Sequence, residues 1–150
     1  MKNTFLLILF SSVVTSLLYG QHTIPDDKQR KDIYLLIEKY SLAREKRDTL
    51  LLKSILSRDV DQLVSTGEWR NGIDASVTGM LNSSANSPGT RALKIEKIRL
   101  LSLNNAIVDC RYEIQNADGK TRKMWSTFIV VYNQGIWKIS AIRNMLPTGQ

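Results

Sequence analysis

The sequence has very little of the chemistry on which most catalytic and metal sites depend. Its 150 residues include one cysteine, Cys110, and one histidine, His22. A single cysteine gives no internal disulfide, so core packing has to supply the stability. Cys110 sits in a strand pattern and is interpreted as a small buried apolar residue. His22 lies in the tail before the first expected helix, which argues against histidine catalysis and a Cys/His zinc site. We expect no metal and no cofactor.

Long hydrophobic runs are equally scarce, and the one that exists lies at the start of the chain. Lys2 precedes an apolar run over residues 5–18, and a small residue follows at position 20. The run is too short and too near the terminus to favour a permanent membrane span. We therefore expect residues 1–20 to be a signal peptide and residues 21–150 to form one secreted or periplasmic domain. An uncleaved anchor is the alternative, because residues 18–20 form an imperfect cleavage site.

The charge is strongly positive but scattered. Lys and Arg number 21 against 14 Asp and Glu, a formal net charge of +7. The basic residues spread over residues 28–47 and 94–123 without an aromatic stacking platform, which is typical of a solvated surface. We expect no nucleic-acid partner, and membrane contact only through the signal peptide before its cleavage.

The C-terminal end predicts two long strands joined by a tight turn. Residues 124–132 are dense in β-branched and aromatic side chains, and Gln134-Gly135 supplies the turn. Both faces of this ribbon are substantially apolar. Both should therefore be covered, one by helices of the same chain and the other by a second subunit. The turn predicts the pairs Tyr132 with Trp137, Val130 with Ile139, and Phe128 with Ala141.

The upstream sequence predicts three helices. The first begins near Pro25, followed by two acidic residues that suit a helix N-terminus. Its apolar residues recur at helical spacing as far as Ala43. Asp48 can cap a short second helix over residues 49–55. A third begins at Ile73 and gives way to a polar loop over residues 82–90.

Strands account for the remaining sequence, over residues 58–70 with a turn near Gly67, then 93–103 and 106–114. A turn at Asp118-Gly119 leads into the C-terminal ribbon. This order predicts an α+β fold: a cone-shaped, curved antiparallel sheet with about three N-terminal helices packed on its concave face. With these turns, Asp109, Arg111 and Arg143 share the inner face with Phe128, Tyr132 and Trp137.

The order and spacing of several short motifs resemble the nuclear-transport-factor-2-like superfamily, and its SnoaL-like branch most of all. The motifs are LSRDVD at 56–61, Gly67, WRNGI at 69–73 and GIWKISAIRN at 135–144. The resemblance covers nearly all of the chain after the signal peptide. It implies a cone open at one end, usually paired as a homodimer through the outer face of the sheet.

The resemblance does not settle the chemistry, because fold does not imply function. The superfamily includes ketosteroid isomerases, epoxide hydrolases, polyketide cyclases and non-catalytic binding or assembly modules. The isomerase base is an Asp on the first strand, where this sequence has Val64. Related members place a His in the cone where this sequence has Arg143. Because Arg cannot act as a base at ordinary pH, this departure favours anion binding over proton transfer.

Two functional hypotheses follow. The first is a non-catalytic homodimeric module whose cone binds a small, partly apolar or anionic molecule. The second is a cofactor-free cyclase, isomerase or hydrolase with Asp61 or Asp109 as the acid or base. Structural roles are the favoured alternative for both: an ion pair with Arg111 for Asp109, and a turn or cap for Asp61. A dimer with a filled cone is a further alternative. The candidate ligand-binding residues are Tyr40, Arg111, Phe128, Tyr132, Trp137 and Arg143. The candidate dimer-interface residues are Tyr112, Trp125, Ile129, Val131 and Ile142.

Overall fold

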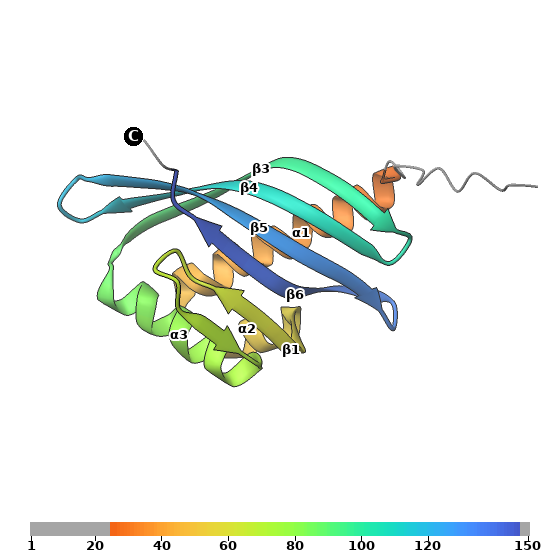
Figure 1. Cartoon of the computed structure of the whole chain (residues 1–150), viewed down its shortest axis with the longest axis horizontal. Coiled ribbons are helices and arrows are strands. Elements are labelled where there is room, and N and C mark those ends of the chain that lie inside the picture. The colour runs from red at the N-terminus through yellow and green to blue at the C-terminus, as the bar shows by residue number, and fades with distance from the viewer. Residues whose placement is uncertain (1–24, 148–150) are drawn as a thin grey trace, which may run out of the picture.

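The computed structural model describes residues 25–147, and the signal peptide expected over residues 1–20 lies outside them. The described part of the chain forms three helices and six strands (Figure 1). No helix in this part is long and apolar enough to cross a membrane. The elements are α1 (Asp27–Lys46), α2 (Thr49–Ile55), β1 (Leu56–Leu63), β2 (Trp69–Asn71), α3 (Ile73–Asn86), β3 (Gly89–Ser102), β4 (Asn105–Asn116), β5 (Thr121–Asn133) and β6 (Ile136–Met145).

The strands form one sheet in the order β2-β1-β6-β5-β4-β3. The pairing is antiparallel throughout except between β1 and β6, which run parallel. Figure 1 shows α1 crossing one face of the long strands, with α2 and α3 at the β1–β2 end. This confirms the α+β prediction of three helices on one face of the sheet. It corrects the expectation of a wholly antiparallel sheet.

Local capping explains where the helices begin. Asp26 and Gln29 form a reciprocal capping box at the start of α1. The carboxylate of Asp48 accepts a 2.9 Å hydrogen bond from the Leu51 N–H and begins α2. Both starts were expected from the sequence.

The polar segment over residues 82–90 was expected to be a loop, and that prediction is wrong. Residues 82–86 continue α3, and only two residues separate the helix from β3. Ser84 is buried, and the Arg91 guanidinium donates hydrogen bonds to the Ser87 and Ser83 carbonyls at 2.6 and 3.5 Å. These tertiary contacts stabilise the last turn of α3. The low helix propensity of the segment does not predict that turn.

The core lies between the helices and the inner face of the sheet. Phe128 on β5 packs edge-on against Tyr40 on α1, with ring centroids 5.1 Å apart. Cys110 on β4 is fully buried, and burial raises the pKa of its thiol to about 12. Its thiol therefore stays protonated at neutral pH, in line with the interpretation of Cys110 as a small apolar residue.

The β5–β6 turn has the predicted form. Gln134 and Gly135 both adopt positive φ, 50° and 85°, which is the backbone of a two-residue hairpin turn. Tyr132 pairs with Trp137, as predicted. A bulge at Ser140 then adds one residue to β6, so the predicted pairing of Phe128 with Ala141 is wrong. The pairs after the bulge are Ile129 with Ala141, Phe128 with Ile142, and Thr127 with Arg143.

The β4–β5 turn is one residue longer than predicted. The Asn116 N–H donates to the Lys120 carbonyl at 2.9 Å, and the enclosed Gly119 has φ 82°. A three-residue loop of this kind displaces the register by one position relative to a two-residue loop. Asp109 therefore pairs with Thr127 and Arg111 with Trp125, on the outer face of the sheet.

Because of these two register differences, several residues lie on the opposite face of the sheet from the one predicted. Ile142 and Tyr112, expected at the outer interface, lie on the inner face and are 0% and 7% exposed. Trp125, Ile129 and Val131 lie on the outer face, where they were expected. The outer face therefore keeps three of its five predicted interface residues.

Candidate functional site

The polar residues predicted to line the cone lie outside it. Arg143 follows the bulge on β6 and faces outward, where its Nη1 donates a 2.7 Å hydrogen bond to the carboxylate of Asp61 on β1. Its guanidinium also lies 4.8 Å from the ring centroid of Trp69 on β2. These contacts fix the β1–β2 hairpin against the end of β6. The predicted placement of Arg143 and Asp61 in the cone is wrong.

The second predicted pair, Asp109 and Arg111, also faces outward. The carboxylate of Asp109 accepts a 2.7 Å hydrogen bond from the Thr127 hydroxyl. Arg111 lies 3.4 Å from the carboxylate of Glu96 and stacks over Trp125 at 5.3 Å. Neither Asp61 nor Asp109 is enclosed by apolar walls, which is what a general acid or base of this fold would need.

The predicted aromatic residues belong to the core or pack against it. Phe128 and Tyr40 lie at its centre. Trp137 is buried in the same cluster near the start of α1, and the partly buried Tyr132 packs against it with ring centroids 5.3 Å apart. Trp137 also borders a groove of about 510 Å³ between α1, α2 and the β5–β6 turn, which Lys28 and Asp32 line as well.

A residue that the sequence analysis did not single out, Arg44, lies inside the fold. It is 6% exposed, near the end of α1. Its Nε donates to the Ser84 hydroxyl at 3.2 Å, and its Nη1 donates to the Tyr40 hydroxyl at 2.9 Å. Among residues 25–147, no Asp or Glu forms an ion pair with it. Arg44 is thus a buried charge with only neutral hydrogen-bond partners.

The neighbouring phenol does not neutralise this charge. Burial raises the pKa of Tyr40, and the positive charge of Arg44 offsets only part of that rise. The phenol therefore stays neutral at physiological pH, while an arginine stays protonated. A buried guanidinium without a counterion is energetically unfavourable, so an anion beside it would be strongly stabilised.

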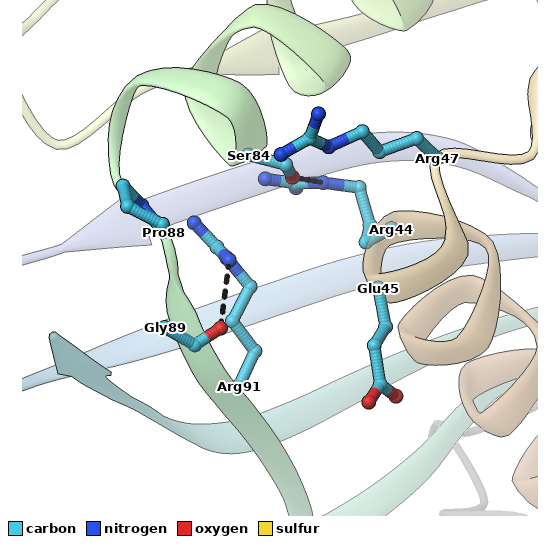
Figure 2. A pocket seen from close by; sticks show the side chains of 7 residues that line it. All are labelled: Arg44, Glu45, Arg47, Ser84, Pro88, Gly89 and Arg91. Atoms are coloured by element: carbon cyan, nitrogen blue, oxygen red, sulfur yellow. Dashed lines mark hydrogen bonds between the residues drawn. The ribbon is translucent and has the colours of Figure 1, made fainter. Parts of the chain in front are cut away.

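Arg44 borders a small cavity of about 110 Å³ at the end of the helical layer, which Figure 2 shows. The cavity lies between the end of α1, the end of α3 and the start of β3. We call it the arginine pocket. Its lining residues are Arg44, Glu45, Arg47, Ser84, Pro88, Gly89 and Arg91.

Two further arginines contribute to the arginine pocket. Arg91 donates to the carbonyls of Ser87 and Gly89 at 2.6 and 3.3 Å, but its buried Nε has no hydrogen-bond partner among residues 25–147. Arg47 ends α1 in the left-handed region, at φ 53°, and its guanidinium extends over Ser84 beside that of Arg44 (Figure 2). Three guanidinium groups, two from the end of α1 and one from β3, therefore line one small cavity.

The only acidic residue of the lining does not offset these charges. Glu45 is exposed, and Figure 2 shows its carboxylate pointing away from the three guanidinium groups. No ion pair joins it to any of them within the described residues. The pocket therefore offers three positive groups and hydrogen-bond donors that its single carboxylate does not pair with, the chemistry of an oxyanion site.

The sequence did contain a signal for Arg44. The apolar stripe of α1 passes through Ile33, Leu36 and Tyr40, and Arg44 is the next position on it, four residues after Tyr40. A charge on a stripe that faces the core needs a partner, and periodicity alone does not identify which one. As for metals, no three His, Cys, Asp or Glu side chains over residues 25–147 come together in a way that could hold an ion.

No protein-family model matches the chain, and no curated protein matches it. Solved structures do. An NTF-2-like protein of unknown function from Shewanella oneidensis is 21% identical over 77% of this chain and 98% of its own, with a TM-score of 0.67. A protein of unknown function with a cystatin-like fold from Nostoc punctiforme is 11% identical over 85% and 97%, with a TM-score of 0.74.

A third solved structure carries a functional description. A ketosteroid isomerase-like protein from Erwinia carotovora is 16% identical over 81% of this chain and 98% of its own, with a TM-score of 0.69. At such identities the likeness shows the fold alone. The chain therefore has the nuclear-transport-factor-2-like, or cystatin-like, fold.

Proposed function

We propose that this chain is an exported, non-catalytic module that binds a small anionic molecule in the arginine pocket and pairs as a homodimer. The observation that carries the proposal is Arg44, which is 6% exposed and has no carboxylate partner in the described part of the chain. Any apolar part of the molecule would extend outward from the pocket, because the core behind Arg44 is filled by Tyr40 and Phe128.

The energetics of Arg44 favour a ligand over a purely structural role. Removing a charge from water carries a penalty of several kcal/mol, and the two hydrogen bonds to Tyr40 and Ser84 offset it without supplying an opposite charge. Tyr40 and Ser84 hold the guanidinium in place, but no hydrogen bond joins its Nη2 to any residue of the described part of the chain. A bound oxyanion would supply the missing charge and accept from the free donor.

The catalytic alternative, a cofactor-free cyclase, isomerase or hydrolase, has less support. It required a pocket carboxylate, and its two candidates lie on the outer face. Asp61 is held by Arg143 at 2.7 Å, and Asp109 by the Thr127 hydroxyl at 2.7 Å. Neither carboxylate lines the arginine pocket.

Binding of small anions tests the proposal directly. Isothermal titration of the mature protein with acetate, benzoate and inorganic phosphate should give saturable binding of at least one of them. Arg44→Met should reduce that affinity by about 10- to 100-fold, since it removes a charge-assisted hydrogen bond. Arg143→Met, which removes an arginine from the outer face, is the matched control and should bind as the parent does. Equal affinity in all three proteins would refute the arginine pocket as the site.

The outer face of the sheet is the proposed dimer interface. Trp125 is 37% exposed there, beside the partly buried Ile129 and Val131. The same face carries charged side chains of both signs, including Asp109, Arg111 and Arg143. A two-fold interface needs one surface that complements itself, which a face carrying both signs of charge can provide.

Disrupting the apolar centre should separate the subunits. Ile129→Asp places a charge on the outer face, and we expect it to convert a dimer into a folded monomer, as measured by sedimentation velocity. Ile136→Asp, at the exposed β5–β6 turn, is the control and should leave the dimer intact. A monomeric parent protein at tens of micromolar would contradict this part of the proposal.

A further inference from the structure

We infer that the arginine pocket selects a dianionic phosphate group, as in a phosphate monoester, over a carboxylate, and that Arg47 supplies this selectivity. The inference rests on the proposed anion binding and adds the chemical class of the ligand and the residue that recognises it. It is carried by the charge, the size and the backbone geometry of the pocket.

The charge of the pocket exceeds what one carboxylate can offset. Arg44, Arg47 and Arg91 bring three positive charges, and no described acidic side chain pairs with them. Arg91 bonds the carbonyl groups of Ser83 and Ser87 at the end of α3, where the helix dipole supplies roughly half a negative charge. A monoanion would still leave more than one positive charge without a partner. A dianion comes close to balancing the site.

The size of the pocket admits a tetrahedral group, and its donors suit one. A cavity of about 110 Å³ holds a phosphate or carboxylate group but no ring behind it. Figure 2 shows Arg44 and Arg47 extending into the pocket from the end of α1, and Arg91 from β3. A tetrahedral oxyanion accepts hydrogen bonds in several directions, whereas a carboxylate presents its acceptors in one plane. The remainder of the ligand would leave past Pro88 and Gly89.

The backbone conformation of Arg47 indicates a functional role for its side chain. Arg47 ends α1 with φ 53° and ψ 39°, a left-handed conformation in which glycine is the usual residue. An arginine there is disfavoured relative to glycine, and such residues concentrate at functional sites. Its guanidinium makes no ion pair within the described residues and extends over Ser84 beside Arg44 (Figure 2). Arg47 thus adds charge to the pocket at the expense of local stability.

Two ligands with the same apolar part test the inference. Phenyl phosphate and benzoate differ in their charged group, and their affinities for the mature protein can be compared by isothermal titration at pH 7.5. We expect phenyl phosphate to bind about tenfold more tightly or better, because it makes one further charge-assisted contact. The preference should shrink at pH 5, where a phosphate monoester with a second pKa of about 6 is mostly a monoanion.

Arg47→Gly separates function from folding. Glycine suits the left-handed backbone, so this variant should unfold at a higher temperature than the parent. Its affinity for phenyl phosphate should fall about tenfold, while its affinity for benzoate stays within about twofold. Lys46→Ala removes a neighbouring charge that does not line the pocket, and it should change neither affinity.

The outcomes distinguish this inference from the function on which it rests. Benzoate binding as tightly as phenyl phosphate, with both lost in Arg44→Met, would overturn the phosphate selectivity and leave anion binding standing. Binding of neither ligand would refute both. If inorganic phosphate binds as tightly as phenyl phosphate, the inference is supported and the free ion is a sufficient ligand. If phenyl phosphate binds more tightly than inorganic phosphate, the ligand of the site is a phosphate ester.

Discussion

An Ile142→Ala variant is expected to lose about 2–5 kcal/mol of unfolding free energy, whereas Arg143→Ala should lose less than about 1 kcal/mol. Ile142 is 0% exposed, and it lies opposite Phe128 on β5 and Gln62 on β1 in the core. Truncating it leaves a cavity among side chains that can relax only partly. Arg143 lies on the outer face, and its bond to Asp61 is partly exposed to water.

The comparison tests the bulge at Ser140. Without the bulge, β6 would present Arg143 to the core and Ile142 to the outer face, and the two effects would exchange. Urea unfolding of both variants measures the difference, with equal slopes needed for the free energies to be comparable. A larger loss in Arg143→Ala than in Ile142→Ala would contradict the register described here.

The same two strands show how far the sequence alone could lead. Tyr132 and Trp137 were paired correctly, because Gln134 and Gly135 can adopt the two positive φ angles that a two-residue turn requires. The helices were located from their caps and their apolar spacing. Turns and helix caps depend on residues that are close together in the sequence, and this local information was sufficient to predict the fold class.

The faces of the polar residues could not be predicted from the same information. One additional residue at Ser140 reverses every side chain after it, and one additional residue in the turn at Gly119 does the same to β4. Each lengthens a loop or a strand by one residue, and several residue types can occupy the additional position. As a result Asp109 and Arg143 were assigned to the cone, and the structure places them outside it.

Arg44 was overlooked for a different reason. Its spacing from Tyr40 places it on the buried stripe, yet an arginine at the end of a helix is ordinarily solvated and favourable to the helix dipole. Its burial depends on Ser84, forty residues later in the chain, and on the continuation of α3 through a segment expected to be a loop. The site became visible only when these distant segments were placed together.

The second large effect is expected from Arg44 itself. In anion-free buffer, the double variant Tyr40→Phe/Arg44→Met should be more stable than the parent protein by about 1–4 kcal/mol. The substitutions remove the buried charge together with the Tyr40 hydroxyl that accepts its 2.9 Å hydrogen bond. Of its two acceptors only the Ser84 hydroxyl, which can rotate, loses a hydrogen bond. Tyr40→Phe alone should destabilise the protein, because the guanidinium then loses a partner and stays buried.

A saturating anion should narrow or reverse this difference. A ligand present at about 100 times its dissociation constant stabilises the folded parent protein by about 2.7 kcal/mol, and the double variant should gain nothing. Thermal or urea unfolding of both proteins, with and without the anion that binds most tightly, measures the change. Arg143→Met serves again as the control and should respond to the anion as the parent does.

The opposite outcome would assign Arg44 to the architecture of the fold. If the double variant is less stable than the parent protein with and without anions, then Tyr40, Ser84 and the end of α3 are sufficient partners for the guanidinium. The charge would then be kept because it joins α1 to α3. If the double variant instead gains stability and loses anion binding, Arg44 belongs to a binding site that costs the fold stability. Such a destabilising charge is retained where a ligand requires it.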